Sequence, residues 1–419
     1  MSWEGRSRGR QGHQLRLWIV ALLAAAAALA AGLGASSAST EAGKPPIKLG
    51  VITSLTGPFT AWGIQTRAGS ALGVNEINRH GGVKGKGGGR LLSLDVQDDG
   101  NSPNTAIDAF RKLTDQDHVV AVGGVISSDV GLATARLAEQ AQVPLFLVKA
   151  GASEILTAKS RYTFRTCLPA AAEVADPILQ FAQKLKVRNV GAIIADYAWG
   201  QSIKAALQND FAKDSNIKLN IQVAPVRTSD FTPYLRALGS GVQLIVATGH
   251  PPGSGAILVQ SGQLGLKVPV SGAYTPFSSV EKAAGAASYG RWSDFKCEAV
   301  GNPGFKALAK RYLRAFPQNV FFEDDALAGY AYVKIIAEAV SKVGDDPKKI
   351  AAYVHGHTFN IPGYTFPLKW TAWGELAAPR VAFDILTKGP PPADGLNTGG
   401  SWWPRELYRS KPLTPYRPS

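Results

Sequence analysis

The sequence has few cysteines, and beyond its N-terminal region it lacks long apolar runs. Its 419 residues include two cysteines and one methionine. Beyond the first forty residues, no apolar run approaches the ~20 residues that a membrane-spanning helix requires. A disulfide-stapled miniprotein and a multi-pass membrane protein are therefore excluded. With 18% charged and 45% hydrophobic residues the chain is not disordered, and its length predicts two or more domains with real cores.

Signatures of common catalytic and metal sites are also missing. The chain contains no C-x-x-C, no H-E-x-x-H and no G-x-S-x-G, which excludes the usual four-ligand zinc site and the nucleophile elbow of hydrolases. Of the six histidines only His355 and His357 have a metal-like spacing, and such a pair in a loop is typical of solvent-exposed residues. Acidic pairs such as Asp98 and Asp99 fall at expected element ends, where they favour turns and helix starts. We therefore expect no catalytic residues, no cofactor and no metal, and we expect the protein not to be an enzyme.

The first 38 residues differ in composition from the rest of the chain. Four arginines between positions 6 and 16 precede an uncharged apolar stretch from Leu17 to Ala31, and Ser36 and Ala38 then form an A-x-A-like cleavage site. This pattern predicts a secretory signal peptide over residues 1–38. The alternative is an uncleaved membrane anchor, because the chargeless stretch extends to Thr40. Removing the four arginines and one glutamate of this segment lowers the formal charge from +14 to about +11.

The remaining positive charge does not indicate a nucleic-acid partner, because no basic helix or aromatic-interleaved basic cluster accompanies it. Cys167 and Cys297 lie 130 residues apart in a chain predicted to be exported, so one long-range disulfide is permitted. Nothing in the sequence shows that the two cysteines meet. Neither follows the apolar N-terminal stretch closely, as a lipoprotein anchor would require.

Apolar runs alternate with helix-length segments from residue 47 onward. Nearly continuous β-branched runs, typical of strands buried on both faces, occupy 47–53, 91–97, 119–126, 143–148, 190–195 and 243–248. Segments with apolar residues three and four apart predict helices over 64–79, 103–116, 130–141, 171–186, 200–214, 254–264, 304–315 and 325–342. This alternation predicts an α/β fold with parallel sheets, and a composition shift at 162–169 predicts a hinge between two domains. Without catalytic apparatus, such a chain indicates a binding protein whose site lies at strand ends in an interdomain cleft.

Several segments carry a family resemblance. IKLGVITSLTGPFTAWGIQTRAGSALGVNEINRHGGVKG (47–85) resembles the opening of the periplasmic leucine/isoleucine/valine-binding proteins of ABC importers. Further matches are DVQDDGNSPNTAI (95–107), VGGVISS (122–128), ADYAWGQ (195–201), ATGHPPGSGAILVQSGQLGL (247–266) and PLKWTAWGEL (367–376). The resemblance covers residues 47–388 in order. It implies a type I periplasmic-binding-protein fold, in which two Rossmann-like lobes with parallel sheets are joined by a three-strand hinge and close around a ligand.

The resemblance also implies the domain bounds. The N-terminal lobe is expected to comprise 47–166 plus 299–363, and the C-terminal lobe 167–298 plus 364–388. Residues 389–419 form a Pro/Trp-rich C-terminal tail outside the resemblance.

Expected ligand contacts from the first lobe follow two strand ends. In the family, the serine at the position of Ser127 and nearby main-chain amides hold the ligand carboxylate, and we include Ser128 among the expected contacts. A helix N-terminus supports this role, because it offers unpaired N–H groups and partial positive charge. The alternative is a plain helix N-cap formed by either serine. The next strand end matches a small-residue turn that also contacts the ligand, formed by Ala150, Gly151, Ala152 and Ser153.

Larger side chains are expected to cover the ligand. Trp62 matches an aromatic residue of the first lobe and Trp199 one of the second, although either could be ordinary core. His250 falls where the family has an aromatic hydroxyl, and it could instead be structural. Tyr274 stands where amino-acid-binding members place the carboxylate that pairs with the ligand's α-ammonium.

This last departure predicts the ligand class, because a buried ammonium without an ionic partner is costly. The hypothesis is a small carboxylate with an apolar or aromatic body and no α-amino group, although Asp129 or Asp196 could supply the missing charge. The resemblance implies a monomeric periplasmic protein that delivers a branched-chain amino-acid-like, aromatic or aliphatic acid to the membrane permease and ATPase subunits of an ABC importer. A sensory ligand-binding protein of the same fold is the alternative.

Overall fold

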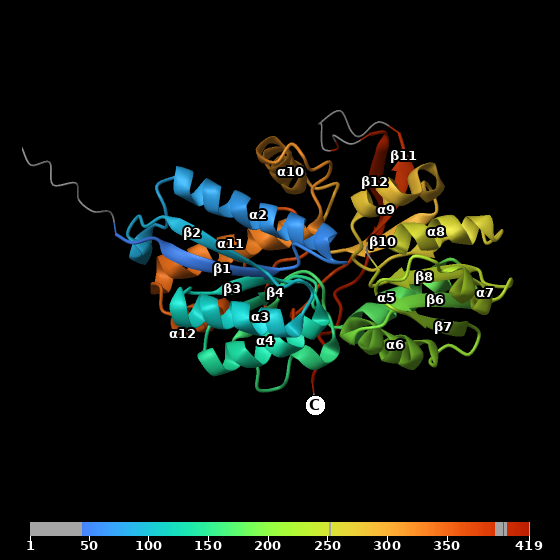
Figure 1. Cartoon of the computed structure of the whole chain (residues 1–419), viewed down its shortest axis with the longest axis horizontal. Helices are drawn as coiled ribbons and strands as arrows, with labels where there is room; N and C mark the ends of the chain where they lie inside the picture. Colours follow the sequence, from blue (N-terminus) through green and yellow to red (C-terminus); the bar gives the residue numbers. More distant parts are fainter. Residues whose placement is uncertain (1–43, 251–252, 390–396, 398–399, 419) are drawn as a thin grey trace, which may run out of the picture. The chain divides into compact units, whose positions relative to one another are not determined.

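The computed structural model describes residues 44–250, 253–389, 397 and 400–418, and it arranges them around two β-sheets (Figure 1). The predicted signal peptide lies outside these residues. Within the described part of the chain, every helix is too short or too polar to cross a bilayer.

The first sheet is parallel and has the strand order β2-β1-β3-β4-β5. Its strands are β1 (Ile47–Thr53), β2 (Leu92–Asp98), β3 (Val122–Val125), β4 (Leu145–Leu147) and β5 (Thr163–Arg165). Helices α2 (Thr60–Arg79) and α11 (Asp324–Val343) pack together on one face, and α3 (Pro103–Arg111) and α4 (Ser128–Ala141) pack together on the other (Figure 1). Helices α10 (Pro303–Ala315) and α12 (Pro347–Gly356) complete this part.

Three helices of this part begin with the same local signal, a capping side chain followed by proline. Ser102 precedes α3, Asn302 precedes α10 and Asp346 precedes α12, and each side chain accepts a hydrogen bond from a first-turn backbone N–H. The proline that follows has a fixed φ suited to a helix and lacks only a donor that would be unpaired there. These starts are therefore encoded locally.

The second sheet has the order β12-β11-β10-β9-β8-β6-β7, parallel from β7 to β10 and antiparallel at β11 and β12. Its strands are β6 (Asn189–Ala195), β7 (Lys218–Ala224), β8 (Leu244–Thr248), β9 (Val270–Ser271), β10 (Trp292–Lys296), β11 (Ala382–Lys388) and β12 (Trp402–Arg409). Helices α5 (Ala171–Lys184) and α6 (Ala198–Phe211) pack against each other, as do α7 (Thr232–Leu238), α8 (Gly253–Gln263) and α9 (Phe277–Ala284) in sequence. Short single-turn elements are η1 (Gly85–Gly87), η2 (Lys112–Gln116), η3 (Ser153–Ile155) and η4 (Gly285–Ser288).

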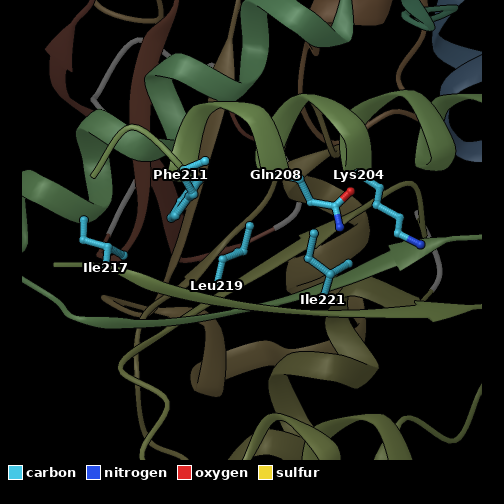
Figure 2. Close-up of a pocket in the computed structure, with 7 residues that line it drawn as sticks. Lys204, Gln208, Phe211, Ile217, Leu219 and Ile221 are labelled. Atoms are coloured by element: carbon cyan, nitrogen blue, oxygen red, sulfur yellow. The ribbon is translucent and has the colours of Figure 1, made fainter. Parts of the chain in front are cut away.

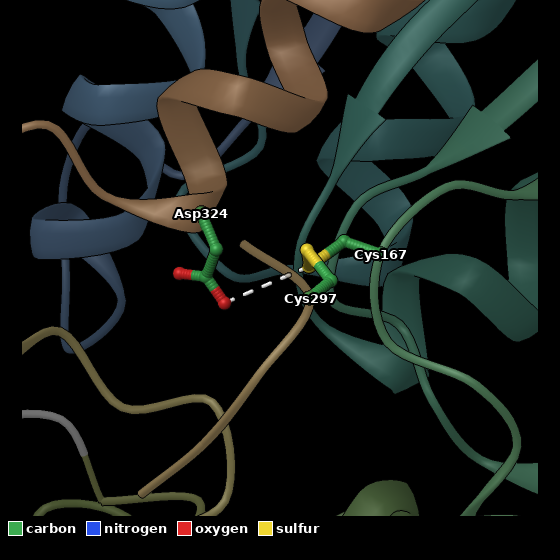
Figure 3. A group of neighbouring side chains, drawn as sticks. All are labelled: Cys167, Cys297 and Asp324. Carbon is green, nitrogen blue, oxygen red and sulfur yellow. Dashed lines mark hydrogen bonds between the residues drawn. A yellow bond between two sulfur atoms is a disulfide. The ribbon is translucent and has the colours of Figure 1, made fainter. Parts of the chain in front are cut away.

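Three chain segments cross between the sheets, from β5 to α5, from β10 to α10, and from α12 to β11. The second and third pair with each other, since the Ala299 N–H donates to the Gly363 carbonyl at 2.7 Å and Thr365 N–H donates to the Cys297 carbonyl at 2.9 Å. A disulfide between Cys167 and Cys297 joins the first crossing segment to the second (Figure 3). The pairing that the sequence left open is therefore present, and it links two crossing segments. The two-lobed α/β fold with a three-strand hinge is confirmed.

The C-terminal residues pack on the body of the protein. β12 adds to the second sheet beside β11, and Trp402 is 1% exposed with its ring centroid 5.4 Å from that of Phe321. Farther on, the Tyr416 N–H donates to Glu173 Oε1 at 2.9 Å, and its carbonyl accepts from Trp373 Nε1 at 3.0 Å. The sequence-based lobe bounds stay a prediction, but part of the segment set apart as a tail contributes a strand to the second sheet.

Candidate functional site

A narrow cavity, with about 10 Å³ of space open to a water-sized molecule, lies where loops that follow strands of both sheets meet. This is the position at which parallel α/β sheets bind ligands, because the loops after the strands gather at one edge. Its lining residues from the first-sheet side are Trp62, Ile126 and Lys149, and those that follow the first crossing are Leu168, Tyr197, Trp199, Gly249, Ala273 and Tyr274. Three of the residues predicted to contact ligand, Trp62, Trp199 and Tyr274, are thus brought together around one cavity.

Both tryptophans are held by hydrogen bonds from their indole nitrogens. Trp62 Nε1 donates to the Tyr274 carbonyl at 3.1 Å, which joins the two sides of the cavity, and Trp199 Nε1 donates to Thr248 Oγ1 at 3.0 Å. The two indoles are 4% and 3% exposed. With their polar atoms satisfied elsewhere, the rings present apolar surface to the cavity at little cost in side-chain entropy.

Ser127 occupies the N-cap position of α4, but its hydroxyl does not cap the helix. Ser127 is fully buried, and its Oγ has no hydrogen-bond partner among the described residues. The neighbouring Ser128 Oγ instead accepts from the Ala152 N–H at 3.1 Å and ties the two predicted binding loops together. An unpartnered buried hydroxyl beside the free N–H groups of a 14-residue helix is suited to an anion.

Arg165 fixes the shape of the small-residue turn after β4. This fully buried guanidinium donates to the Ala152 carbonyl at 2.7 Å and also to the Ala150 carbonyl, and its Nε donates to Glu375 Oε2 at 2.7 Å. A planar, multi-donor group is well suited to holding two carbonyls and a carboxylate at once. The turn is therefore positioned from behind by a residue outside the predicted set.

Contacts between the two sides show a closed arrangement. A Cβ placed on Gly151 would lie 2.5 Å from Cζ3 of Trp199, so only glycine permits this approach. The Ser153 N–H donates to Ser202 Oγ at 2.9 Å, and Asp129 Oδ1 accepts from the Ala198 N–H at 3.1 Å. Asp129 therefore joins the two sides of the closed structure and is not among the residues that line the cavity.

His250 does not line the cavity, and Gly249 before it does. The imidazole is fully buried and packs edge-on against Phe231, with ring centroids 5.2 Å apart. Burial lowers the pKa of His250 to about 4, so the ring is neutral near pH 7. Asp196, the other acid considered as an ammonium partner, accepts from Gln201 Nε2 at 2.7 Å and also lies outside the lining.

Sequence reasoning missed two polar lining residues, Lys149 and Tyr197. Lys149 directly follows the strand predicted over 143–148, and Tyr197 lies two residues after the strand predicted over 190–195. This position at a strand end is the signal that could have identified them. Burial raises the pKa of Tyr197, with Asp129 adding to the shift, so the phenol stays neutral. Its ring centroid lies 5.2 Å from that of Phe59, which extends the aromatic contact across the two sides.

A network of buried charged groups lies behind the cavity, where the crossing segments meet. Asp324, at the start of α11, has one oxygen 2.5 Å from Lys149 Nζ and the other 3.5 Å from Lys296 Nζ. Although burial opposes it, the two lysines lower the pKa of Asp324. Burial raises the pKa of the adjacent Asp325 well above its usual range, despite Lys149 nearby. The disulfide packs against the same group, with Cys167 Sγ 3.6 Å from Asp324 Oδ2 (Figure 3).

The network contains acids spaced closely enough to hold a cation, since carboxylate oxygens of Glu298, Glu323 and Asp324 lie within 4.8 Å of one another. Glu323, however, accepts from the N–H and the hydroxyl of Ser278, and Lys296 already places an ammonium beside Asp324. The cysteine sulfurs beside Asp324 are bonded to each other and are not thiolate ligands. Hydrogen bonds and ammonium groups therefore account for two of the three acids.

Glu298 is the third, and it makes the network sensitive to pH. It is fully buried, and neither carboxyl oxygen has a hydrogen-bond partner among the described residues. Burial, reinforced by Asp324, raises the pKa of Glu298 well above its usual range. Folding therefore takes up a proton, and this group makes the stability fall as the pH rises above its unfolded pKa, about 4.3.

We expect Glu298→Gln to raise the melting temperature by several degrees at pH 8 and to change it little at pH 4.5. The amide removes the need to bury a charge or to take up a proton, and it keeps the size of the side chain. Thermal denaturation across this pH range measures the effect, with Glu338→Gln on the exposed face of α11 as the matched control. An equal effect of Glu298→Gln on the melting temperature at both pH values would contradict the coupling between folding and proton uptake by Glu298.

A larger and more open groove lies between α6 and the edge strand β7, and all of its lining residues belong to the second-sheet part of the protein (Figure 2). Its lining is mainly aliphatic and aromatic, with Phe211, Ile217, Leu219 and Ile221 on its walls. Lys204 and Gln208 lie along the helix side (Figure 2). Among the described residues, none that lines this groove has a buried polar side-chain atom without a hydrogen-bond partner. The cavity between the lobes differs, because the buried hydroxyl of its lining residue Tyr274 has no partner among the described residues.

Two α/β lobes joined by three crossing segments, with a narrow aromatic cavity between them, define a two-lobed ligand-binding protein. Comparison with known proteins identifies its family. The chain belongs to the periplasmic binding protein family, whose model matches residues 46–377.

Individual relatives are similar over most of their length. A leucine-, isoleucine-, valine-, threonine- and alanine-binding protein of Pseudomonas aeruginosa is 27% identical over 336 residues, 78% of this chain and 87% of that protein. A solute-binding protein of an ABC transporter from R. palustris, solved with benzoate, is similar in structure with a TM-score of 0.74, 20% identity, and coverage of 88% of this chain and 98% of that one. A leucine-binding protein from Thermotoga maritima has a TM-score of 0.72, 20% identity, and coverage of 88% and 99%.

Proposed function

We propose that the protein is a periplasmic solute-binding protein that captures a small carboxylate and delivers it to the permease and ATPase subunits of an ABC importer. The observation that carries this proposal is the narrow aromatic cavity between the lobes, whose lining residue Ile126 directly precedes Ser127 with its unpartnered buried hydroxyl at the start of α4. Ligand would bind first to one lobe, and closure would follow because the closed form adds contacts from the other. Export by the predicted signal peptide places the protein where it can meet the solute. We further propose that it works as a monomer and releases its ligand unchanged.

The ligand class follows from the charge of the lining. Lys149 is the only charged residue among those that line the cavity in the described structure, and no aspartate or glutamate is among them. A ligand ammonium would be buried there without an adjacent carboxylate, which is costly. Similarity alone does not choose a ligand, because the neighbours include both a leucine-binding protein and a protein solved with benzoate. The lining favours an aromatic or branched aliphatic acid that lacks an α-amino group.

Calorimetric titration of residues 39–419 tests the function and the ligand class together. We expect benzoate or 4-methyl-2-oxopentanoate to bind and leucine and phenylalanine to bind at least tenfold more weakly. Ser127→Ala should weaken binding of the acids about 10- to 100-fold, the range for a hydrogen bond to a charged group. It should leave the melting temperature of the free protein unchanged, because the hydroxyl has no hydrogen-bond partner among the residues that the structure describes.

Ser128→Ala provides the comparison, since that hydroxyl accepts from the Ala152 N–H and its loss should lower stability. Tight binding of leucine and phenylalanine with no response to the other acids would overturn the ligand class. Failure of every amino acid and carboxylate to bind would overturn the proposed function itself.

A further inference from the structure

Lys149 differs from the other residues that line the cavity in carrying a charge. Its side chain is 3% exposed, and the residue lies two positions after Leu147, the last residue of β4. The Lys149 N–H donates to the Val125 carbonyl at 3.1 Å, so Lys149 lies beside the end of β3 and therefore close in space to the Ser127 loop. The cation and the unpartnered hydroxyl thus start from adjacent strand ends.

The ammonium of Lys149 is held in place by the start of α11. Nζ lies 2.5 Å from Asp324 Oδ2 and 3.4 Å from Asp325 Oδ1. It also lies 4.9 Å from the centroid of the Tyr274 ring, which lines the cavity and carries a hydroxyl without a described partner. The lysine is therefore oriented before any ligand arrives, which lowers the entropy lost on binding.

The main acid partner of Lys149 is shared with a second lysine. Asp324 is shared, because its second oxygen faces Lys296 Nζ at 3.5 Å. Asp324 thus contacts both ammonium groups, and burial raises the pKa of Asp325 well above its usual range. Lys296 has a second fixed acceptor, the Thr275 carbonyl at 2.6 Å, but Lys149 has no carbonyl acceptor among the recorded hydrogen bonds of the described residues. A ligand anion in the cavity that Lys149 lines would add an ionic partner that is not shared with Lys296.

We propose that Lys149 is a specificity-determining residue that selects ligands by their negative charge, while Asp324 and Asp325 hold its ammonium beside the ligand cavity. This inference rests on the proposed function and names the group that discriminates anions from neutral molecules of the same shape. The hydroxyl of Ser127 and the N-terminus of α4 then hold the carboxylate, and Lys149 contributes the ionic attraction.

The test compares matched anionic and neutral ligands on wild type and variants. The pairs are benzoate with benzamide, and 4-methyl-2-oxopentanoate with 4-methyl-2-pentanone. Lys149→Met should reduce the preference for the anion of each pair about 10- to 100-fold, the range for a charge-assisted hydrogen bond, and should affect the neutral partner much less. Lys149→Arg should retain most of the preference. Lys310→Met, on the exposed surface of α10, removes the same formal charge and should not change the affinity for either ligand of a pair.

Lys149→Met leaves Asp324 and Asp325 with fewer counter-charges and could reduce folding. The double variant Lys149→Met with Asp325→Asn removes one acid together with the lysine, and it should fold and show the same loss of anion preference. Equal weakening of anion and neutral molecule, or an unchanged preference in the folded double variant, would overturn this inference while leaving the proposed function standing. Absence of anion binding to wild type would instead overturn the proposed function, and the inference with it.

Discussion

Gly151→Val is expected to weaken ligand binding at least 100-fold while the protein remains folded. In the closed structure a Cβ at this position would lie 2.5 Å from Trp199 Cζ3 and 2.6 Å from Leu168 Cδ2, both closer than real Cβ atoms approach other heavy atoms. The two larger valine methyl groups cannot be accommodated without moving the indole or separating the lobes. Since closure is what encloses the ligand, the variant loses the contacts that the second lobe would add.

Calorimetric titration and small-angle X-ray scattering with and without ligand would measure the effect of Gly151→Val. Ligand should reduce the radius of gyration of the wild type. At the same ligand concentrations, the radius of gyration of the variant should remain that of an open form. Gly356→Val is the matched control, because this exposed glycine at the end of α12 has open space around its Cβ position. Wild-type affinity in Gly151→Val would show that the close approach to Trp199 is not needed for binding.

Arg165→Met is expected to lower the free energy of unfolding by about 3–5 kcal/mol, the range for breaking one side of a buried ion pair. The substitution leaves the carbonyls of Ala150 and Ala152 without their donor and Glu375 without its counter-charge. Burial already raises the pKa of Glu375, although Arg165 opposes the shift, so the carboxyl should bind a proton in the variant. Urea or thermal denaturation would show the loss, and the ligand affinity of the folded fraction should fall because the turn loses its support.

A second substitution separates the two causes. Arg165→Met with Glu375→Gln removes the unpaired acid, so it should recover part of the lost stability but not the ligand affinity, which depends on the turn carbonyls. Arg236→Met, on the exposed side of α7, is the control and should change stability by no more than about 0.5 kcal/mol. A loss below 1 kcal/mol in Arg165→Met would contradict the positioning role of the guanidinium.

The sequence predicted best the elements whose own residues define them. The run at 47–53 is β1 over the same residues, and the helix expected over 304–315 is α10, which begins at Pro303 after its Asn302 cap. β7 was missed because it lies at a sheet edge and polar and apolar residues alternate along most of it, so no continuous apolar run marks it. β12 was missed for a different reason. Its pairing with β11 is a contact between strands separated by a long connection, and neither strand's composition specifies it.

The candidate site divides in a similar way. Trp62, Trp199 and Tyr274 could be placed around the ligand from the resemblance, and all three line the cavity. Arg165 could not be found from sequence, since its role depends on carbonyls contributed by another loop and on a carboxylate 210 residues away. The importance of Lys149 was equally hidden, because its neighbours Asp324 and Asp325 looked like ordinary helix-start residues until the fold placed them behind the cavity.

The position of the disulfide has a topological consequence for the whole molecule. Cys167 and Cys297 stand at the two ends of the segment that contains β6 to β10, so their bond closes this segment into a covalent ring with a sequence separation of 130 residues. In the chain-entropy model, closing a ring of this size disfavours the unfolded state by about 5 kcal/mol. A single proteolytic nick anywhere within that ring would leave one covalent molecule, with both fragments still tethered at the crossing segments. The two pieces separate only if the backbone is cut and the disulfide is also reduced. In an oxidising environment the two lobes therefore stay covalently joined even when the backbone of the second lobe is cut within the ring.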